Sequence, residues 1–140
     1  LNETNWKDLD YLIIDLPPGT GDIQLTLCQK IPVSGAVIVT TPQDIALMDA
    51  KKALKMFEKV EVPVLGVVEN MSTHICSNCG HEEHIFGHGG AKAEAERLVI
   101  PFLGEVPLSA DIRKQSDAGK GYDLSAELIE AVQAALRSSV

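Results

Sequence analysis

The sequence predicts an α/β fold built on a parallel sheet, and three observations favour it. Short runs of aliphatic and β-branched residues alternate with longer segments whose apolar residues recur at helical spacing. Of the 140 residues, 45% are hydrophobic, which allows one sizeable core. No repeat, low-complexity tract or linker divides the chain. We therefore expect a single domain over residues 1–140.

Four apolar runs are predicted to be strands. The first, Tyr-Leu-Ile-Ile, has the all-apolar character of a strand buried on both faces of a parallel sheet. The second, Gly-Ala-Val-Ile-Val-Thr, is rich in β-branched residues, which favour strands. The four predicted strands are residues 11–14, 35–40, 64–69 and 102–105.

Four segments are predicted to be helices, at residues 22–30, 45–59, 91–98 and 123–136. Asp22 opens the first predicted helix and Asp44 precedes the second, so both are candidate N-caps. Residues 70–90 interrupt the pattern with glycines, histidines and two nearby cysteines, and residues 107–121 are expected to be a loop with a short helix. The last predicted helix has an apolar face for the core, formed by Leu124, Leu128, Ile129 and Val132.

The segment after the first predicted strand carries the strongest functional signal. Asp15 ends that strand, where open α/β sheets bind ligands, and a carboxylate there suits Mg²⁺. Gly19 and Gly21 would let backbone amides approach phosphate oxygens. The alternative is a tight turn in which Asp22 only caps a helix. The run Asp-Leu-Pro-Pro-Gly-Thr-Gly-Asp is more particular than such a turn needs, which favours a loop that senses a γ-phosphate.

A phosphate-binding loop of the form G-x-x-x-x-G-K-[ST] should accompany such a segment, but the sequence contains none. The nearest candidate, Gly119-Lys120, has Lys114 where the first glycine belongs. We therefore expect this chain to be the later part of a larger nucleotide-binding protein. The first residue, Leu1, fits a truncated or processed product.

Cys76-Ser-Asn-Cys79 is a candidate metal-binding pair, because two thiolates at this spacing can bind one ion. A redox pair is a weaker alternative, since no thioredoxin-like context surrounds it. A zinc site and a [4Fe-4S] cluster completed by the same two cysteines of a second copy remain open, because spacing does not separate them. The histidines that would complete a zinc site are His81 with His84, or His74 with His88.

Other polar and reactive residues have simpler interpretations. Cys28 lies among leucines on the first predicted helix and is expected to be a small core residue. Asn70 follows the third predicted strand and is either a turn residue or a side chain that contacts a base. A solvated helix face is expected for Asp111, Arg113 and Asp117.

Composition restricts the partners and the compartment that we expect. The formal net charge of -8 argues against nucleic acid and anionic membranes as main partners. No apolar run approaches the ~20 residues that a membrane span needs, and no signal peptide is evident. Three cysteines, two of them close together, suit a reducing cytosol, so we expect a cytoplasmic protein.

Together these segments closely resemble the Mrp/ApbC family of P-loop proteins, within the MinD/ParA/nitrogenase-iron-protein superfamily. The resemblance implies a three-layer, parallel-sheet P-loop NTPase fold, with an insertion at about residues 70–90 that carries the CxxC pair. It also implies an ATP-dependent carrier that passes a [4Fe-4S] cluster to apoproteins, as a homodimer in which each subunit contributes one CxxC pair. The matching segments are residues 10–22, 40–49, 66–72, 76–81, 86–87 and 104–108.

The resemblance also implies roles for individual residues. Asp15 would be the Walker B carboxylate that acts through Mg²⁺, and Asn70 would contact adenine. Ser77 stands where many members have proline, but both thiols are in place. The remaining implied residues are Gly19 and Gly21 for γ-phosphate, Pro107 and Leu108 for the adenine pocket, and Cys76 and Cys79 for the cluster.

The sequence lacks a phosphate-binding loop, and two functions other than a cluster carrier remain as alternatives. Without the lysine and amides of a Walker A loop, the 140-residue chain alone is expected neither to hydrolyse ATP nor to bind it tightly. One rival is a zinc-stabilised interaction module. The other is a MinD/ParA-like positioning ATPase, which the acidic composition and the lack of a basic amphipathic face in residues 123–140 disfavour.

Overall fold

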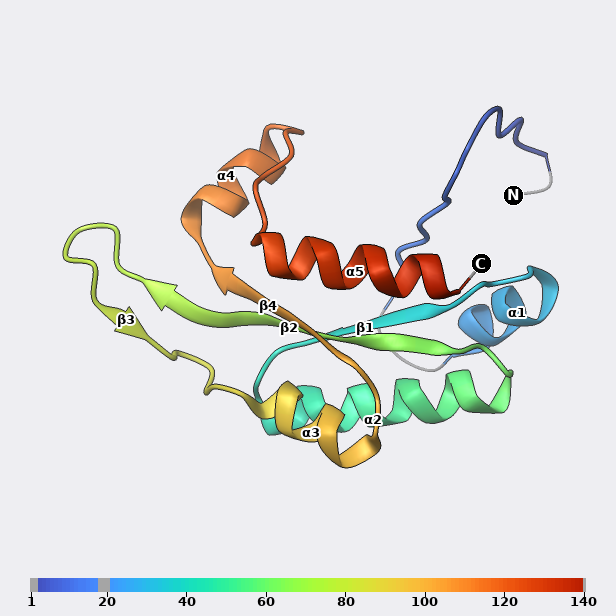
Figure 1. Cartoon of the computed structure of the whole chain (residues 1–140), viewed down its shortest axis with the longest axis horizontal. Coiled ribbons are helices and arrows are strands. Elements are labelled where there is room, and N and C mark those ends of the chain that lie inside the picture. The colour runs from blue at the N-terminus through green and yellow to red at the C-terminus, as the bar shows by residue number, and fades with distance from the viewer. Residues whose placement is uncertain (1–2, 18–20, 140) are drawn as a thin grey trace.

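The computed structural model describes residues 3–17 and 21–139 as alternating helices and strands (Figure 1). Within these residues, no helix combines the length and the apolar character needed to cross a membrane. The elements are α1 Asp22–Lys30, β1 Ala36–Thr40, α2 Asp44–Lys59, β2 Val64–Ile75, β3 Glu82–Glu83, α3 Gly90–Leu98, β4 Phe102–Leu108, α4 Ala110–Asp117 and α5 Ala126–Ser138.

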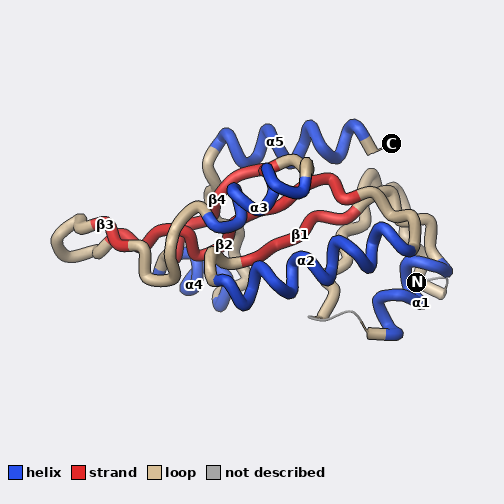
Figure 2. The backbone as a smooth tube through the Cα atoms, turned by 90° about the horizontal axis from the view of Figure 1, so that it is seen from below, coloured by secondary structure: helices blue, strands red, loops and turns tan. Residues whose placement is uncertain are grey.

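The sheet is built around β2, which pairs in parallel with β1 and β4 and antiparallel with β3. Helices α2 and α3 lie on one face of the sheet and α5 lies on the other (Figures 1 and 2). The prediction of a layered α/β fold with a mainly parallel sheet is therefore confirmed. The short β3 makes the sheet mixed rather than purely parallel.

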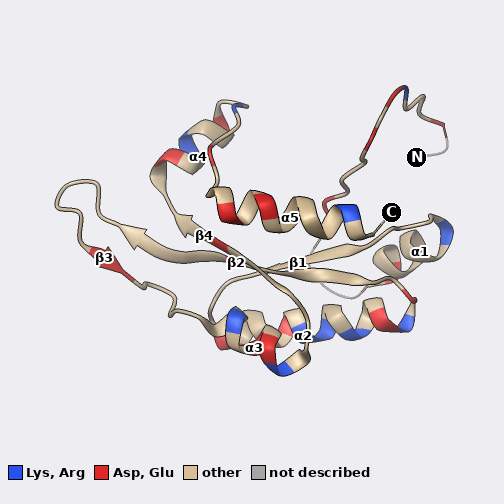
Figure 3. Cartoon of the chain, in the orientation of Figure 1, with Lys and Arg blue, Asp and Glu red and all other residues tan. Residues whose placement is uncertain are grey.

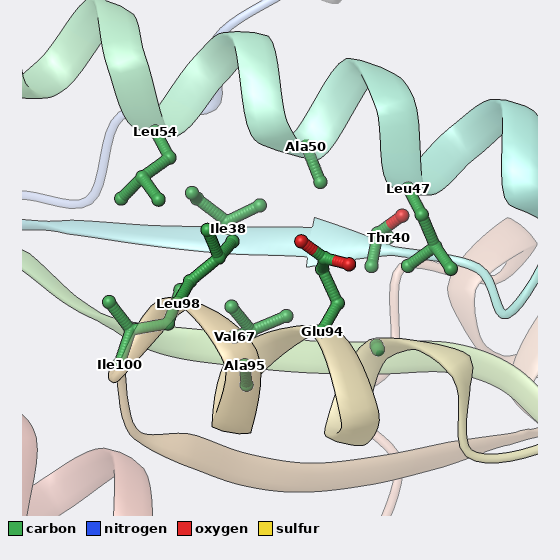
Figure 4. A pocket seen from close by; sticks show the side chains of 11 residues that line it. Ile38, Thr40, Leu47, Ala50, Leu54, Val67, Glu94, Ala95, Leu98 and Ile100 are labelled. Atoms are coloured by element: carbon green, nitrogen blue, oxygen red, sulfur yellow. The ribbon is translucent and has the colours of Figure 1, made fainter.

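Two apolar clusters hold the layers together, because successive residues of β2 point to opposite faces. Val67 packs with α2 and α3, whereas Val68 packs with Leu128 of α5. Ala91 and Ala95 are each 1% exposed, and their small side chains allow α3 to lie close to the sheet. The cavity between α2, α3 and the sheet has a volume of about 10 Å³, space for about one water molecule and none for a nucleotide (Figure 4).

The predicted strand at residues 11–14 is wrong: this segment has no strand pairing among the described residues. Its four apolar side chains are 36–75% exposed, and Ile13 is the most exposed of them. Tyr11 instead lines a surface hollow with Gln133, Leu136 and Arg137 of α5. An apolar run becomes a buried parallel strand only where a neighbouring strand pairs with its backbone and layers cover both faces. The described residues supply neither to this run.

The other differences are smaller. Strand β2 continues to Ile75, six residues beyond the predicted end, because it pairs with β4 and then with β3. The predicted core face of the last helix is right at Leu128, which is 2% exposed, but wrong at Ile129, which is 41% exposed. Leu124 and Val132 pack against the same cluster. The N-cap positions of α1 and α2 are Gly21 and Gln43, one residue before the predicted aspartates.

Two predictions about burial are confirmed. Cys28 is buried in the core, where burial raises the pKa of its thiol. On α4, Arg113 forms an exposed ion pair of 2.7 Å with Asp117, as expected for a solvated face. Charged side chains of both signs lie along the helices, while β1 carries none (Figure 3).

Candidate functional site

Cys76 and Cys79 lie in the turn of the β2–β3 hairpin, which projects from the body of the molecule at the end opposite α1 (Figure 1). The hairpin is set by the register of His74 with Glu83 and of Ile75 with Glu82. Within the turn, the N–H of Gly80 donates to the carbonyl of Cys76 at 2.8 Å, and the N–H of Cys76 donates to the carbonyl of His81 at 2.9 Å. These bonds fold the chain back so that both cysteines occupy one tight turn.

The electrostatics of this turn favour the thiolate of Cys76. The backbone N–H groups of Asn78 and Cys79, together with the Cys79 thiol, hydrogen-bond its sulfur and lower its pKa. Cys76 is half-buried and Cys79 is exposed, so both sulfurs are accessible. Thiolates are the form that binds metal ions, and the turn therefore presents a preorganised two-sulfur site.

No histidine completes a closed zinc site around the two cysteines in the described part of the chain. The Nδ1 of His74 lies 3.2 Å from the carbonyl of Leu108, and that of His84 lies 3.2 Å from the carbonyl of Ser72. The ring of His88 stacks on that of His84 with centroids 4.3 Å apart. In this arrangement, no third His, Cys, Asp or Glu of the described residues forms a ligand group with the two cysteines.

Asn70 and the segment Pro107-Leu108 are brought together by the pairing of β2 with β4, in which Asn70 lies opposite Val106. The Oδ1 of Asn70 accepts a hydrogen bond of 3.0 Å from the N–H of Met71, whose φ of 58° is left-handed. Its Nδ2 makes no hydrogen bond to another described residue, so it can donate to a ligand. Asn70 and Val106 are 36 positions apart in the sequence, and the parallel register of β2 with β4 makes them neighbours.

Of the predicted phosphate-sensing residues, the structure describes Asp15 and Gly21. Asp15 is exposed and forms no salt bridge with a lysine or arginine in residues 3–17 and 21–139. Gly21 is the N-cap of α1, and a Cβ added there would lie 3.2 Å from the Oε1 of Gln24. Gln24 is 4% exposed and donates a 2.9 Å hydrogen bond to the carbonyl of Pro17, which ties α1 to the preceding segment. Gly19 lies outside the described residues.

Sequence reasoning missed a second group of potential ligands, namely Glu69, His88 and Glu105. Their ligand atoms lie within 4.8 Å of one another, although the residues come from β2, from the loop before α3 and from β4. Glu69 was included in a predicted strand without any function. The sequence signal that could have found it is a glutamate at the end of an apolar run predicted to be a buried strand, since such a group needs partners.

Comparisons with known proteins agree on one family. The ParA family, described as NUBPL iron-transfer P-loop NTPase, matches residues 1–138. An iron-sulfur cluster carrier protein of Escherichia coli strain K12 is 68% identical over 119 residues, which is 85% of this chain and 32% of that protein. The iron-sulfur cluster transfer protein NUBPL of Mus musculus is 58% identical over 120 residues, covering 86% of this chain and 38% of that protein. The chain thus spans about a third of the length of these relatives.

A solved structure supports the fold. It is a nucleotide-binding protein of Archaeoglobus fulgidus in complex with ADP, with cobalt found by PIXE. The TM-score is 0.74 at 44% sequence identity, and the match covers 87% of this chain and 50% of that one.

Proposed function

The chain belongs to the NUBPL iron-transfer P-loop NTPase family, and from this premise we propose that it is the cluster-holding part of an ATP-dependent iron–sulfur carrier. Cys76 and Cys79 bind the cargo, a [4Fe-4S] cluster, and release it to apoproteins. The observation that carries this proposal is the projecting hairpin turn, which holds two accessible sulfurs and lowers the pKa of Cys76.

The proposal includes a homodimer. A [4Fe-4S] cluster needs four thiolates, and this hairpin supplies two. Because no third protein ligand lies beside them among the described residues, two copies that face each other through their hairpins complete the set. Exposure of Cys79 at the tip suits such an arrangement, since both the partner copy and a recipient apoprotein must reach the cluster.

The ATP dependence is proposed for a longer protein that contains both this chain and a phosphate-binding loop. There, Asp15 would hold Mg²⁺ through water, and Gly19 and Gly21 would approach the γ-phosphate. The carboxylate of Asp15 is exposed and forms no salt bridge with a described residue, which fits a Mg²⁺ ion that is bound through few carboxylates and keeps its waters. The ion would neutralise charge on the phosphates.

The adenine site would use Asn70 with Pro107 and Leu108. Asn70 and Cys76 belong to one continuous segment of β2 and its turn, and β4 runs alongside it. We propose that nucleotide state reaches the cysteines along this one segment, whose register with β4 shifts between Asn70 and His74.

Anaerobic reconstitution with iron and sulfide tests the cluster. We expect broad visible absorption at one [4Fe-4S] cluster per two chains in the wild type, its loss in Cys76→Ser and in Cys79→Ser, and its retention in Ser77→Ala, the matched change in the same turn. Tight binding of one zinc ion per chain that resists iron would instead support the zinc-stabilised module.

Magnesium-dependent ATP hydrolysis tests the proposed nucleotide site. In the full-length protein, we expect Asp15→Asn to lower ATP hydrolysis by about 10–100-fold, the cost typical of a lost outer-shell metal contact. Asp111→Asn, an exposed change on α4, is the control. The 140-residue chain alone should not turn over ATP, and measurable turnover by it would contradict this part of the proposal.

A further inference from the structure

We propose that Glu69, His88 and Glu105 form a second metal site, which binds one borderline divalent cation such as Zn²⁺ or Co²⁺ and is separate from the two cysteines. We name these three residues the Glu69–His88–Glu105 triad. Its ligand atoms all lie within 4.8 Å of one another, close enough for one ion to reach them. The proposal does not depend on the iron–sulfur function, because neither cysteine takes part.

The parallel register of β2 and β4 brings the two carboxylates together. Glu69 and Glu105 lie opposite each other in the pairing, so both side chains point to the face covered by α3. Neither carboxylate forms a salt bridge with a lysine or arginine of the described chain. Glu69 is buried and Glu105 is half-buried, so a divalent cation between them would balance the negative charge that two neighbouring carboxylates can carry.

Glu69 is held in place in the way that metal-binding carboxylates are. It is fully buried, and its two oxygens accept hydrogen bonds from the N–H groups of Gly89 at 3.1 Å and Ala91 at 2.7 Å. Each oxygen keeps a second lone pair for an ion. Outer hydrogen bonds of this kind orient ligands and are a regular feature of metal sites.

His88 supplies a nitrogen donor from the outside. It stands between Gly87 and Gly89, whose φ values of 92° and 70° form the turn that directs the chain back toward α3. The ring stacks on His84 and makes no hydrogen bond to another described residue, so its nitrogens are available. Because His88 is exposed, an ion can enter from solvent and keep water as a further ligand.

The donor set indicates the class of ion. One imidazole with two carboxylates suits Zn²⁺, Co²⁺, Fe²⁺ or Mn²⁺, whereas Mg²⁺ and Ca²⁺ prefer oxygen alone. A bound ion would join β2, β4 and the start of α3 at the base of the hairpin that carries Cys76. We therefore expect the ion to raise the melting temperature of the chain as its concentration exceeds the dissociation constant.

The test uses Co²⁺ and the full chain with Cys76→Ser and Cys79→Ser, which removes the sulfur site. We expect one equivalent of Co²⁺ to bind, with weak d–d absorption and no sulfur-to-cobalt charge transfer. Adding His88→Ala or Glu105→Gln should weaken the affinity about 10-fold or more. Adding His81→Ala, a histidine of the same hairpin outside the triad, should leave it unchanged.

Two results would overturn the proposal: a titration that shows no saturable site, or an affinity that neither His88→Ala nor Glu105→Gln alters. Urea unfolding of each variant without metal checks that the fold is retained. Both substitutions avoid Glu69, whose replacement would itself disturb the fold.

Discussion

The carboxylate of Glu69 accepts a hydrogen bond of 2.7 Å from the backbone N–H of Ala91, which fixes the start of α3 to the central strand. Glu69 is 0% exposed, and it is the only charged residue among the buried residues of the described chain. Its partners are N–H groups at a helix N-terminus, where the helix dipole also favours a negative charge. Glu69 therefore caps a helix from a strand 20 residues earlier.

Replacing Glu69 with alanine should destabilise the chain by about 2–4 kcal/mol, because two N–H groups lose their acceptor in a buried site. The free energy of unfolding in urea measures this. Glu96→Ala removes a carboxylate from the exposed side of the same helix and should change that free energy by less than about 0.5 kcal/mol. Equal effects of the two changes would contradict the capping function.

Gly90 allows α3 to begin against the loop after β1, and Gly90→Ala should cost about 1–3 kcal/mol of stability through overpacking. A Cβ there would lie 2.6 Å from the carbonyl oxygen of Pro42 and 3.0 Å from the Cδ1 of Leu47. Gly121→Ala is the matched control, since a Cβ at Gly121 meets nothing within 4 Å. Thermal unfolding of both variants makes the comparison. A fully stable Gly90→Ala protein would show that this contact yields easily.

Cys76 should react with iodoacetamide at lower pH than an ordinary thiol, because its hydrogen bonds lower its pKa. Cys28 should require higher pH, because burial raises its pKa. Mass spectrometry of the metal-free chain alkylated across a pH series measures each site, and denaturation in urea should bring the two curves together. Since the folded chain loses the Cys76 proton more readily than the unfolded chain, the resulting stabilisation exists above the unfolded pKa and disappears as the pH falls through the folded one.

Asn70→Asp separates the two groups of the Asn70 side chain. The aspartate keeps an oxygen that accepts from the N–H of Met71, but it loses the Nδ2 donor proposed to contact adenine. In the full-length protein, we expect the preference for ATP over GTP to fall about tenfold, the equivalent of one hydrogen bond of about 1.4 kcal/mol. The added charge affects both nucleotides alike, so the ratio of their affinities is the informative quantity. Asn78→Asp in the hairpin turn should leave this ratio unchanged, and an unchanged ratio in Asn70→Asp would remove Asn70 from the adenine site.

Much of the fold could be predicted because its signals are local. Helix α2 shows regular helical spacing of Leu47, Leu54 and Phe57, and all three are buried. The β-branched run of β1 and the position of Cys28 in the core followed in the same way. Local patterns failed where pairing with distant residues decides the outcome. Residues 11–14 have the composition of a strand but pair with no other strand of the described chain, and β2 runs past its apolar part because β3 and β4 pair with it.

In the candidate site, too, local features could be predicted from the sequence and long-range groupings could not. The sequence by itself determined the CxxC pair, because Cys76 and Cys79 are close in the chain and a short turn suffices to bring their sulfurs together. Only the tertiary structure decided that Asn70 lies opposite Val106, and that Glu69, His88 and Glu105 converge. Such groupings depend on strand register and on where α3 docks, and a register is set by the summed packing of both faces of a sheet rather than by any short run of residues.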